Sequence, residues 1–273
     1  EDHAVTAALT MTEIEIHADQ RGAVVDGIGR ALLRIDGVRG ADNRMRKSFI
    51  EVLGKLKDKR ATPTLVKVML KRDASQNFLF NILAAQQLVG IADPAATGDL
   101  IKALYWFDTN NPAMRMNDVA TAGLVAIGQP ALQPLLETLA GKNAEANEIV
   151  KLYVETIKQK DAEAARKIIQ STVVSTEAAT TLGKLGLREA LDPLIAETKA
   201  ADETRAFNAA IALVSISRKD EDTPRIAAEL KRVYGALEKQ LRPQMLVAMR
   251  HMYASATPAS SSFPASLPSS AAN

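Results

Sequence analysis

Apolar residues recur at helical spacing from residue 45 to residue 69, with one polar break between them. The first run has its apolar positions at Met45, Phe49, Val52, Leu53 and Leu56. This is the spacing of one helix face. The polar residues 57–60 interrupt the run, and Thr62 followed by Pro63 is typical of a helix start. A second apolar run follows at Leu65, Val68 and Met69. The pattern therefore predicts a helix, a tight turn and a second helix.

This helix pair recurs along the chain. Its turns align at Lys57, Ala92, Gly128, Gly186 and Ser217. The successive spacings are 35, 36, 58 and 31 residues, and the long spacing contains a further predicted helix pair at residues 147–169. Paired helices with a period in the mid-thirties are typical of an α-solenoid. We therefore expect an all-α fold, a right-handed α-solenoid of about six helix pairs.

The residues around these turns are similar to those of HEAT repeats, whose pattern is roughly L-G-x-L-x-D-x-R-A-x-P-x-L. The first pair matches this pattern at Leu53, Gly54, Leu56, Asp58, Arg60, Ala61, Pro63 and Leu65. Two later pairs match it in part, at Leu182, Gly183, Leu185, Ala190, Pro193 and Leu194, and at Leu124, Ile127, Gly128, Ala131 and Pro134. The resemblance covers about residues 44–233 and implies stacked, HEAT-like helix pairs. It implies no single function, because this fold serves scaffolds, transport receptors, lyase subunits and nucleic-acid enzymes.

The turn residues lead to two further expectations. The Asp and Arg of each turn are expected to hydrogen-bond between neighbouring units. The glycine is expected to let the first helix end in a left-handed conformation.

The two ends of the chain depart from the repeat. Residues 1–29 are expected to form an irregular or helical N-terminal cap, although Ile14 and Ile16 alternate with polar residues as in a strand. The HEAT-like array is expected to span residues 30–253. Residues 254–273 are uncharged and rich in Ser, Ala and Pro, which indicates a flexible tail or linker.

The helix before this tail is apolar on nearly every side. We predict a terminal interface there, at Met245, Met249, Met252 and Tyr253. A true terminal cap should present a polar face to water, so we expect these methionines to be covered. The tail, a partner or further repeats could cover them.

Charge is distributed unevenly, although the net charge is only +2. Residues 1–29 carry one basic and six acidic side chains, whereas residues 30–72 carry thirteen basic and four acidic ones. The candidates for a basic patch lie on two helix faces, at Arg44, Lys47 and Lys55, and at Lys67 and Lys71. Such a patch can meet nucleic acid, anionic lipid or an acidic protein. The favoured alternative is a solvated face neutralised by residues 1–29, since the segment lacks the exposed aromatics of nucleic-acid binders.

The only tryptophan, Trp106, lies between Tyr105 and Phe107. We expect these residues at the end of a helix, with Tyr105 in the core and Trp106 about 100° away from it. The stretch "DTNNPAM" then predicts a long turn between two repeats. We predict a partner-binding surface formed by Trp106, Asn110, Asn111, Met114 and Met116. The alternative is that Trp106 fills a junction between repeats.

The chain offers little recognisable catalytic chemistry. It has no cysteine and three widely separated histidines. The arrangement nearest to a metal cluster is Glu13, Glu15, His17 and Asp19, and a solvated charged edge explains it better. Phosphate-binding loops and nucleophile elbows are missing from the sequence. We therefore expect no catalytic residue, no cofactor and no metal, and a protein that is not an enzyme.

These observations favour a non-catalytic scaffold or adaptor that binds another protein through an elongated solenoid surface, as part of a larger complex. The first alternative is binding of nucleic acid or an anionic surface through residues 30–72. The second is a HEAT-like enzyme or lyase subunit.

No apolar run approaches the ~18 residues of a membrane span, so a soluble protein is expected, in a compartment that the sequence leaves open.

Overall fold

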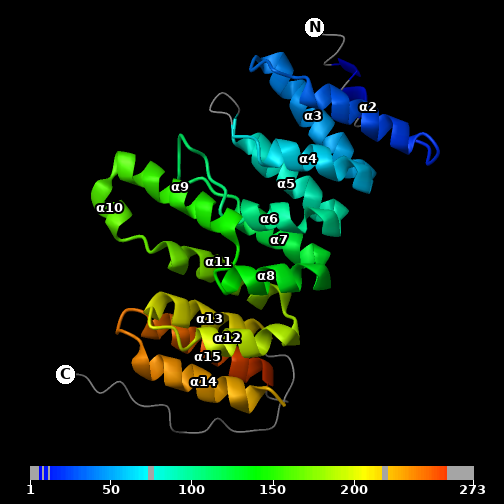
Figure 1. Ribbon diagram of the computed structural model, residues 1–273. Coiled ribbons are helices and arrows are strands. Elements are labelled where there is room, and N and C mark those ends of the chain that lie inside the picture. The colour runs from blue at the N-terminus through cyan, green and yellow to red at the C-terminus, as the bar shows by residue number, and fades with distance from the viewer. Residues whose placement is uncertain (1–5, 8, 12, 73–76, 217–220, 257–273) are drawn as a thin grey trace.

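The computed structural model describes residues 6–7, 9–11, 13–72, 77–216 and 221–256, with side chains up to residue 250. Within these ranges the regular secondary structure is helical, apart from one isolated β-bridge between Phe107 and Arg115. The helices stack in pairs along one long axis (Figure 1). The fold is an all-α solenoid of stacked helix pairs, as the repeat pattern predicted.

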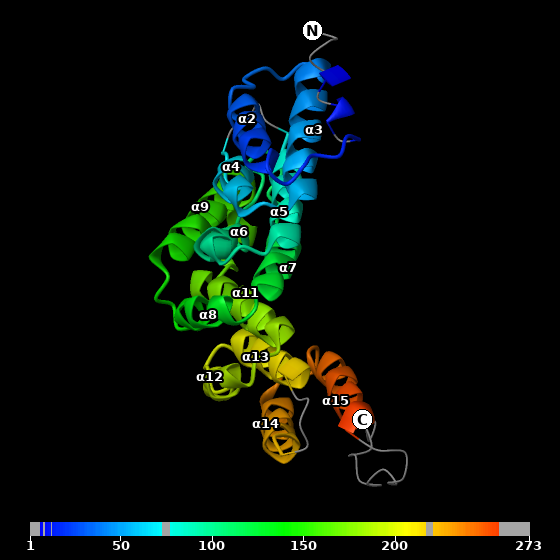
Figure 2. The same ribbon diagram turned by 90° about the vertical axis from the view of Figure 1, so that its right-hand side faces the viewer.

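The first helices of the pairs form one row, which we call row A. Row A consists of α3 (Gly40–Leu56), α5 (Leu79–Ile91), α7 (Asn117–Ile127), α11 (Gln170–Leu185), α13 (Glu203–Ile216) and α15 (Arg242–Ala256). Consecutive members of this row pack against one another. The row is bowed, and its solvent side lies on the inner side of the curve (Figure 2).

The second helices form row B on the other side of the molecule (Figure 2). Row B consists of α2 (Arg21–Leu33), α4 (Thr62–Met69), α6 (Thr97–Ala103), α8 (Leu132–Leu139), α12 (Leu191–Glu197) and α14 (Thr223–Ala236). Short 3-10 helices precede some of them: η1 (Lys59–Ala61), η2 (Pro94–Ala96), η3 (Gln129–Ala131) and η4 (Arg188–Ala190). These 3-10 helices are the tight turns that the sequence predicted.

The long spacing between two turns holds an additional helix pair, as predicted. Helix α9 (Ala144–Lys160) starts where the side chain of Asn143 accepts a hydrogen bond from Ala146 N at 3.0 Å. The short α10 (Ala162–Arg166) follows directly and is capped in the same way by Asp161. Helix α9 packs against α6 and α11. It therefore lies beside the loop that joins α6 to α7.

The aligned turns share a positive φ, and Lys57, Ala92 and Gly186 are left-handed helical, whereas Gly128 has a ψ of −135°. Lys57, Ala92 and Gly186 end their helices at φ values of 50°, 50° and 68°, and Gly128 has a φ of 78°. The predicted alignment is confirmed at these four positions, while Ser217 lies outside the described residues. A left-handed helix end favours glycine because a Cβ is strained there. Lys57 and Ala92 therefore adopt this conformation at some cost in stability.

The expected bond between neighbouring units is not formed by the first turn. Arg60 bonds Asp58 inside the same turn, with 2.9 Å between Nη2 and Oδ2. Its guanidinium nevertheless covers Gly22 of α2, where a Cβ would lie 1.8 Å from Arg60 Nη1. An ionic bond between units occurs further along the array, where Arg188 Nε lies 2.8 Å from Asp222 Oδ2.

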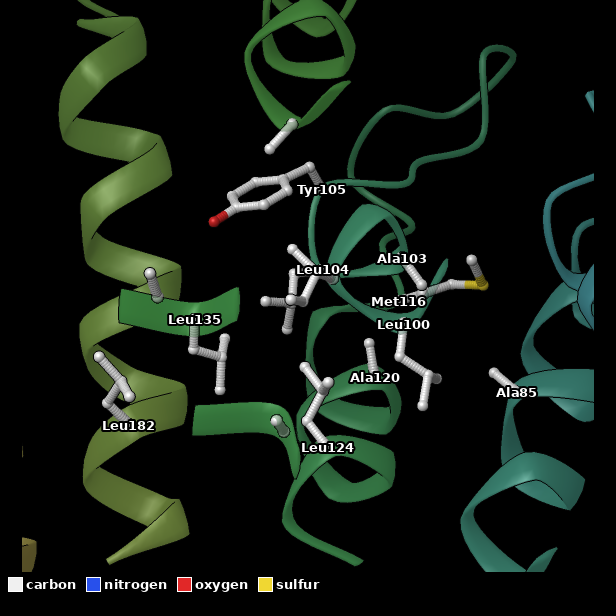
Figure 3. Packing of buried hydrophobic residues seen from close by; sticks show 14 of the residues in the cluster. Ala85, Leu100, Ala103, Leu104, Tyr105, Met116, Ala120, Leu124, Leu135 and Leu182 are labelled. Carbon is white, nitrogen blue, oxygen red and sulfur yellow. The ribbon is translucent and has the colours of Figure 1, made fainter. Parts of the chain in front are cut away.

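One hydrophobic core runs through the array. Leu100 of α6, Leu135 of α8 and Leu182 of α11 belong to this core and are fully buried (Figure 3). Leu104 and Tyr105 follow α6 and are buried in the same cluster. The predicted place of Tyr105 in the core is confirmed.

The ends of the chain differ in detail from the expected division. The expected boundary at residue 29 falls inside α2, which is one continuous helix. Residues 13–17 form no strand. Helix α15 continues to Ala256, past the expected start of the tail at residue 254, and residues 257–273 lie outside the described part. The division into cap, array and tail stays a prediction.

Candidate functional site

The loop of residues 104–116, between α6 and α7, folds back on itself. Helix α6 ends at Ala103, so the expectation that Phe107 lies on that helix is wrong. Phe107 instead forms a β-bridge with Arg115. Two backbone hydrogen bonds close the loop: Asp108 N to Met114 O at 3.0 Å, and Met116 N to Trp106 O at 3.2 Å. We call residues 104–116 the hairpin loop.

Helix α11 holds the base of the hairpin loop. The buried Tyr105 donates its hydroxyl proton to Val174 O at 2.8 Å, and burial raises the pKa of Tyr105. Arg115 Nη2 lies 2.9 Å from Glu177 Oε1. Burial raises the pKa of Glu177 above its ordinary value, and the positive charge of Arg115 opposes that rise. The loop base is therefore held by one buried hydrogen bond and one partly buried ion pair.

Helix α9 holds the outer part of the same loop. The Phe107 ring packs edge-on against Tyr153, with 5.1 Å between ring centroids. Lys160 Nζ donates a hydrogen bond to Asn110 O at 2.7 Å. The additional helix pair thus supports a loop that would otherwise extend into solvent.

The Trp106 side chain is half-buried and packs against the core. Arg72, which follows α4, lies over the indole with its guanidinium carbon 4.1 Å from the Trp106 ring centroid. The same carbon lies 5.1 Å from the Phe107 ring centroid. Trp106 therefore occupies a junction between successive helix pairs, which was the alternative considered from the sequence.

The other candidates of this surface differ in exposure. Asn110 and Asn111 are exposed and Met114 is half-buried. Met116 is only 1% exposed, so it cannot contact a partner directly, and its place in the predicted surface is wrong. The β-bridge explains this burial, because it turns Met116 back toward the core.

The candidate basic residues lie in both helix rows. Arg44, Lys47 and Lys55 are exposed on α3 in row A. Lys67 and Lys71 are exposed at α4 in row B. The structure therefore separates the candidates into two groups instead of one continuous patch.

Acidic residues of the N-terminal segment lie beside part of the basic group on α3. Glu13 and Glu15 line a cavity of about 230 Å³ together with Arg21 and Lys55. Lys47 is paired with Glu51 at 3.6 Å on the same helix. Glu13 and Glu15 therefore lie near Lys55, whereas Lys47 is paired with Glu51, which lies outside residues 1–29. Neutralisation of this face by residues 1–29 stays a prediction.

The solvent side of row A carries little charge along α5, α7, α11 and α13, in contrast to α3. Most of its exposed or half-buried outward residues are uncharged: Leu79, Gln86, Ala122, Val125, Ala126, Thr180, Thr204, Asn208, Ile211 and Ser215. The exposed Asp118 and Lys184 are exceptions, because they lie one helical turn from Ala122 and Thr180. We call the uncharged set the uncharged strip. Leu79 and Val125 within it are 54% and 37% exposed.

The few charged side chains of these four helices bond within the chain. Asp118 pairs with Lys184 at 3.9 Å, Glu177 with Arg115 at 2.9 Å and Arg205 with Glu197 at 2.6 Å, and Glu203 accepts a hydrogen bond from Glu238 N. The charges on and beside the strip therefore already have partners within the chain.

No protein-family model matches the chain, and no curated protein matches it. It is similar to a solved structure of human deoxyhypusine hydroxylase in complex with glycerol. The two share 19% identity over 86% of this chain and 97% of that chain, with a TM-score of 0.29. A likeness of that size transfers no activity.

The expectation that the protein is not an enzyme is not upheld, and the similar solved structure is that of an enzyme. The expectation rested on missing short motifs. Catalytic groups contributed by separate helices leave no such motif, so the absence of short motifs could not support the expectation.

Within the described ranges, no group of three or more His, Asp or Glu side chains is arranged to hold a metal ion. No described helix is long and apolar enough to span the membrane.

The predicted terminal interface is only partly described. Met245 is fully buried, so it is not available to a partner, and Met249 is half-buried against the core. The chain itself therefore covers Met245 fully and Met249 in part, and the terminal interface stays a prediction. The side chains of Met252 and Tyr253 lie outside the described residues.

Two features of the candidate site were not predicted from the sequence. The contact of Arg72 with Trp106 joins residues 34 positions apart, and no local spacing signals it. The uncharged strip did leave a signal, because residues 79–91 contain no charged side chain and residues 117–127 contain only Asp118.

Proposed function

We propose that this protein binds another protein through the uncharged strip of row A. The observation that supports the proposal is the scarcity of charge along the outward side of α5, α7, α11 and α13, where the exposed Asp118 and Lys184 pair with each other at 3.9 Å. Charged residues are depleted at the centres of protein–protein interfaces, because each must lose its hydration on binding. The charges nearby already bond within the chain, so burying the strip leaves no ion without a partner.

The bowed shape of row A supports the same proposal. Row A borders the inner side of the curve (Figure 2), and a partner segment lying there can touch several successive helices at once. Stacked helical repeats commonly bind through such extended concave surfaces. Binding of this kind is compatible with a catalytic role for the array.

Site-specific photo-crosslinking tests the proposal. A benzophenone side chain placed at Ala122, inside the strip, is expected to yield a discrete adduct with one protein in the native cells. The matched control places the same side chain at Gln133, which is exposed on α8 in row B. Val125→Arg is expected to abolish the adduct from position 122, because a charge must then be buried at the interface.

Equal adducts from both positions would contradict the proposal. Persistence of the adduct in the Val125→Arg variant would also contradict it. Circular dichroism of each variant establishes that the array is still folded.

A further inference from the structure

Arg72 differs from the other arginines that lie over aromatic rings. The guanidinium of Arg46 donates to Ile35 O at 2.9 Å, and that of Arg242 donates to Leu237 O at 2.9 Å. Arg115 is bonded to Glu177. Among the described residues, the guanidinium of Arg72 has no hydrogen bond or ion pair, although it lies over both Trp106 and Phe107. Its donors are therefore available to a ligand.

The surface beneath Arg72 is rigid. Phe107 is buried and held by its bridge to Arg115 and by the Tyr153 ring. The tip of the hairpin loop is held by Lys160. A cation over aromatic rings is stabilised by their negative faces, and fixed rings limit its movement. Little conformational freedom is then lost when a ligand binds.

The local charge favours an anion. Arg72 is exposed, and the exposed Lys160 donates a hydrogen bond to Asn110 O of the same loop. Asp108 also belongs to this loop, but its Oδ1 accepts a hydrogen bond from Asn110 N at 2.8 Å. Partial loss of hydration lowers the pKa of Arg72, and a poorly hydrated guanidinium forms strong bonds with anions.

We propose that Arg72, supported by Trp106 and Phe107, binds a carboxylate side chain of an acidic peptide segment. The planar guanidinium presents parallel N–H donors that match the two oxygens of a carboxylate. A single-stranded nucleic acid fits less well, because its bases need open aromatic faces and Arg72 covers the Trp106 ring. This site belongs to the hairpin loop, so it does not depend on binding through the uncharged strip.

The single tryptophan of the chain provides a direct test, because it lies beneath the proposed site. The full-length protein is titrated with a capped hexaglutamate peptide while Trp106 fluorescence is recorded. We expect a saturable change that hexaglutamine does not produce. Arg72→Ala is expected to abolish it, and Arg72→Lys to weaken binding about tenfold, since lysine keeps the charge but lacks the planar fork.

The matched control is Arg44→Ala, which removes an exposed arginine from α3 and should leave the titration unchanged. Circular dichroism and thermal unfolding establish that each variant is folded. The proposal is overturned if hexaglutamate gives no saturable change, or if folded Arg72→Ala or Arg72→Lys responds as the unmodified protein does. It is also overturned if inorganic phosphate or a short oligothymidylate binds more tightly than hexaglutamate, since the site would then recognise phosphate.

Discussion

At the scale of single residues, the turns contain strain that can be relieved. Lys57 holds a φ of 50° at the end of α3, where Gly186 holds the equivalent position of α11 at 68°. A non-glycine residue in this conformation costs roughly 1–2 kcal/mol. Glycine removes that cost but gives the unfolded chain more freedom, which offsets part of the gain.

We therefore predict that Lys57→Gly raises the free energy of unfolding by about 0.5–1 kcal/mol. Urea denaturation followed by circular dichroism measures the change. Lys59→Gly is the matched control, because Lys59 is also exposed but has a negative φ, and this variant should lose stability. An equal loss in the free energy of unfolding of both variants would show that the conformation of Lys57 is not strained.

The individual residues show what a sequence can and cannot predict. The helix ends at Lys57 and Ala92 were located without glycine, because apolar spacing locates a turn whatever residue occupies it. Tyr105 was placed in the core for the same reason. Met116 was misplaced because the β-bridge that buries it has no periodic signal.

At the scale of helices, glycine has a second role, in close helix packing, that the repeat pattern does not indicate. Gly54 and Gly183 occupy the same position of the HEAT-like pattern, and neither has a positive φ. They instead allow close packing between neighbours in row A. A Cβ at Gly183 would lie 2.8 Å from Ala212 Cα, whereas a Cβ at Gly54 would lie 1.9 Å from Gln87 Oε1. The first obstacle is backbone, and the second is a flexible side chain.

This difference predicts different outcomes for the same substitution. Gly183→Ala should lower the free energy of unfolding by roughly 1–3 kcal/mol, because α11 and α13 must move apart. Gly54→Ala should lose less stability, because Gln87 can turn away and alanine favours a helix over glycine by about 1 kcal/mol. Thermal and urea denaturation of both variants provide the comparison. A loss at Gly54 as large as that at Gly183 would contradict this account of the packing.

The arrangement of the hairpin loop could not be predicted at the scale of elements. Its supports come from α9 and α11, and the bond from Tyr105 to Val174 joins residues 69 positions apart. The additional helix pair itself was predicted from the 58-residue spacing. Periodicity therefore located the helices, whereas their contacts with an irregular loop depend on tertiary packing.

At the scale of the whole molecule, the array has no single centre. Each helix packs mainly against its neighbours in the two rows, and one core continues along the stack. In such an array, the free energy of unfolding is close to a sum of contributions from single repeats and from the interfaces between neighbours. Separate parts can therefore unfold at different temperatures. Trp106 reports the region of α4, α6 and α9, while circular dichroism reports all helices.

We predict that Leu213→Ala separates these two signals. Leu213 is fully buried in α13, and losing its side chain should cost about 3 kcal/mol. The circular dichroism transition should begin at a lower temperature, while the Trp106 fluorescence transition moves less, because the hydrogen bonds that hold the hairpin loop come from α9 and α11. Leu100→Ala, at an equally buried position in α6, should lower both transitions together. If Leu213→Ala also shifts both by the same amount, the array unfolds as one cooperative unit, and the coupling must pass through the contact of α11 with α7, α8 and α9.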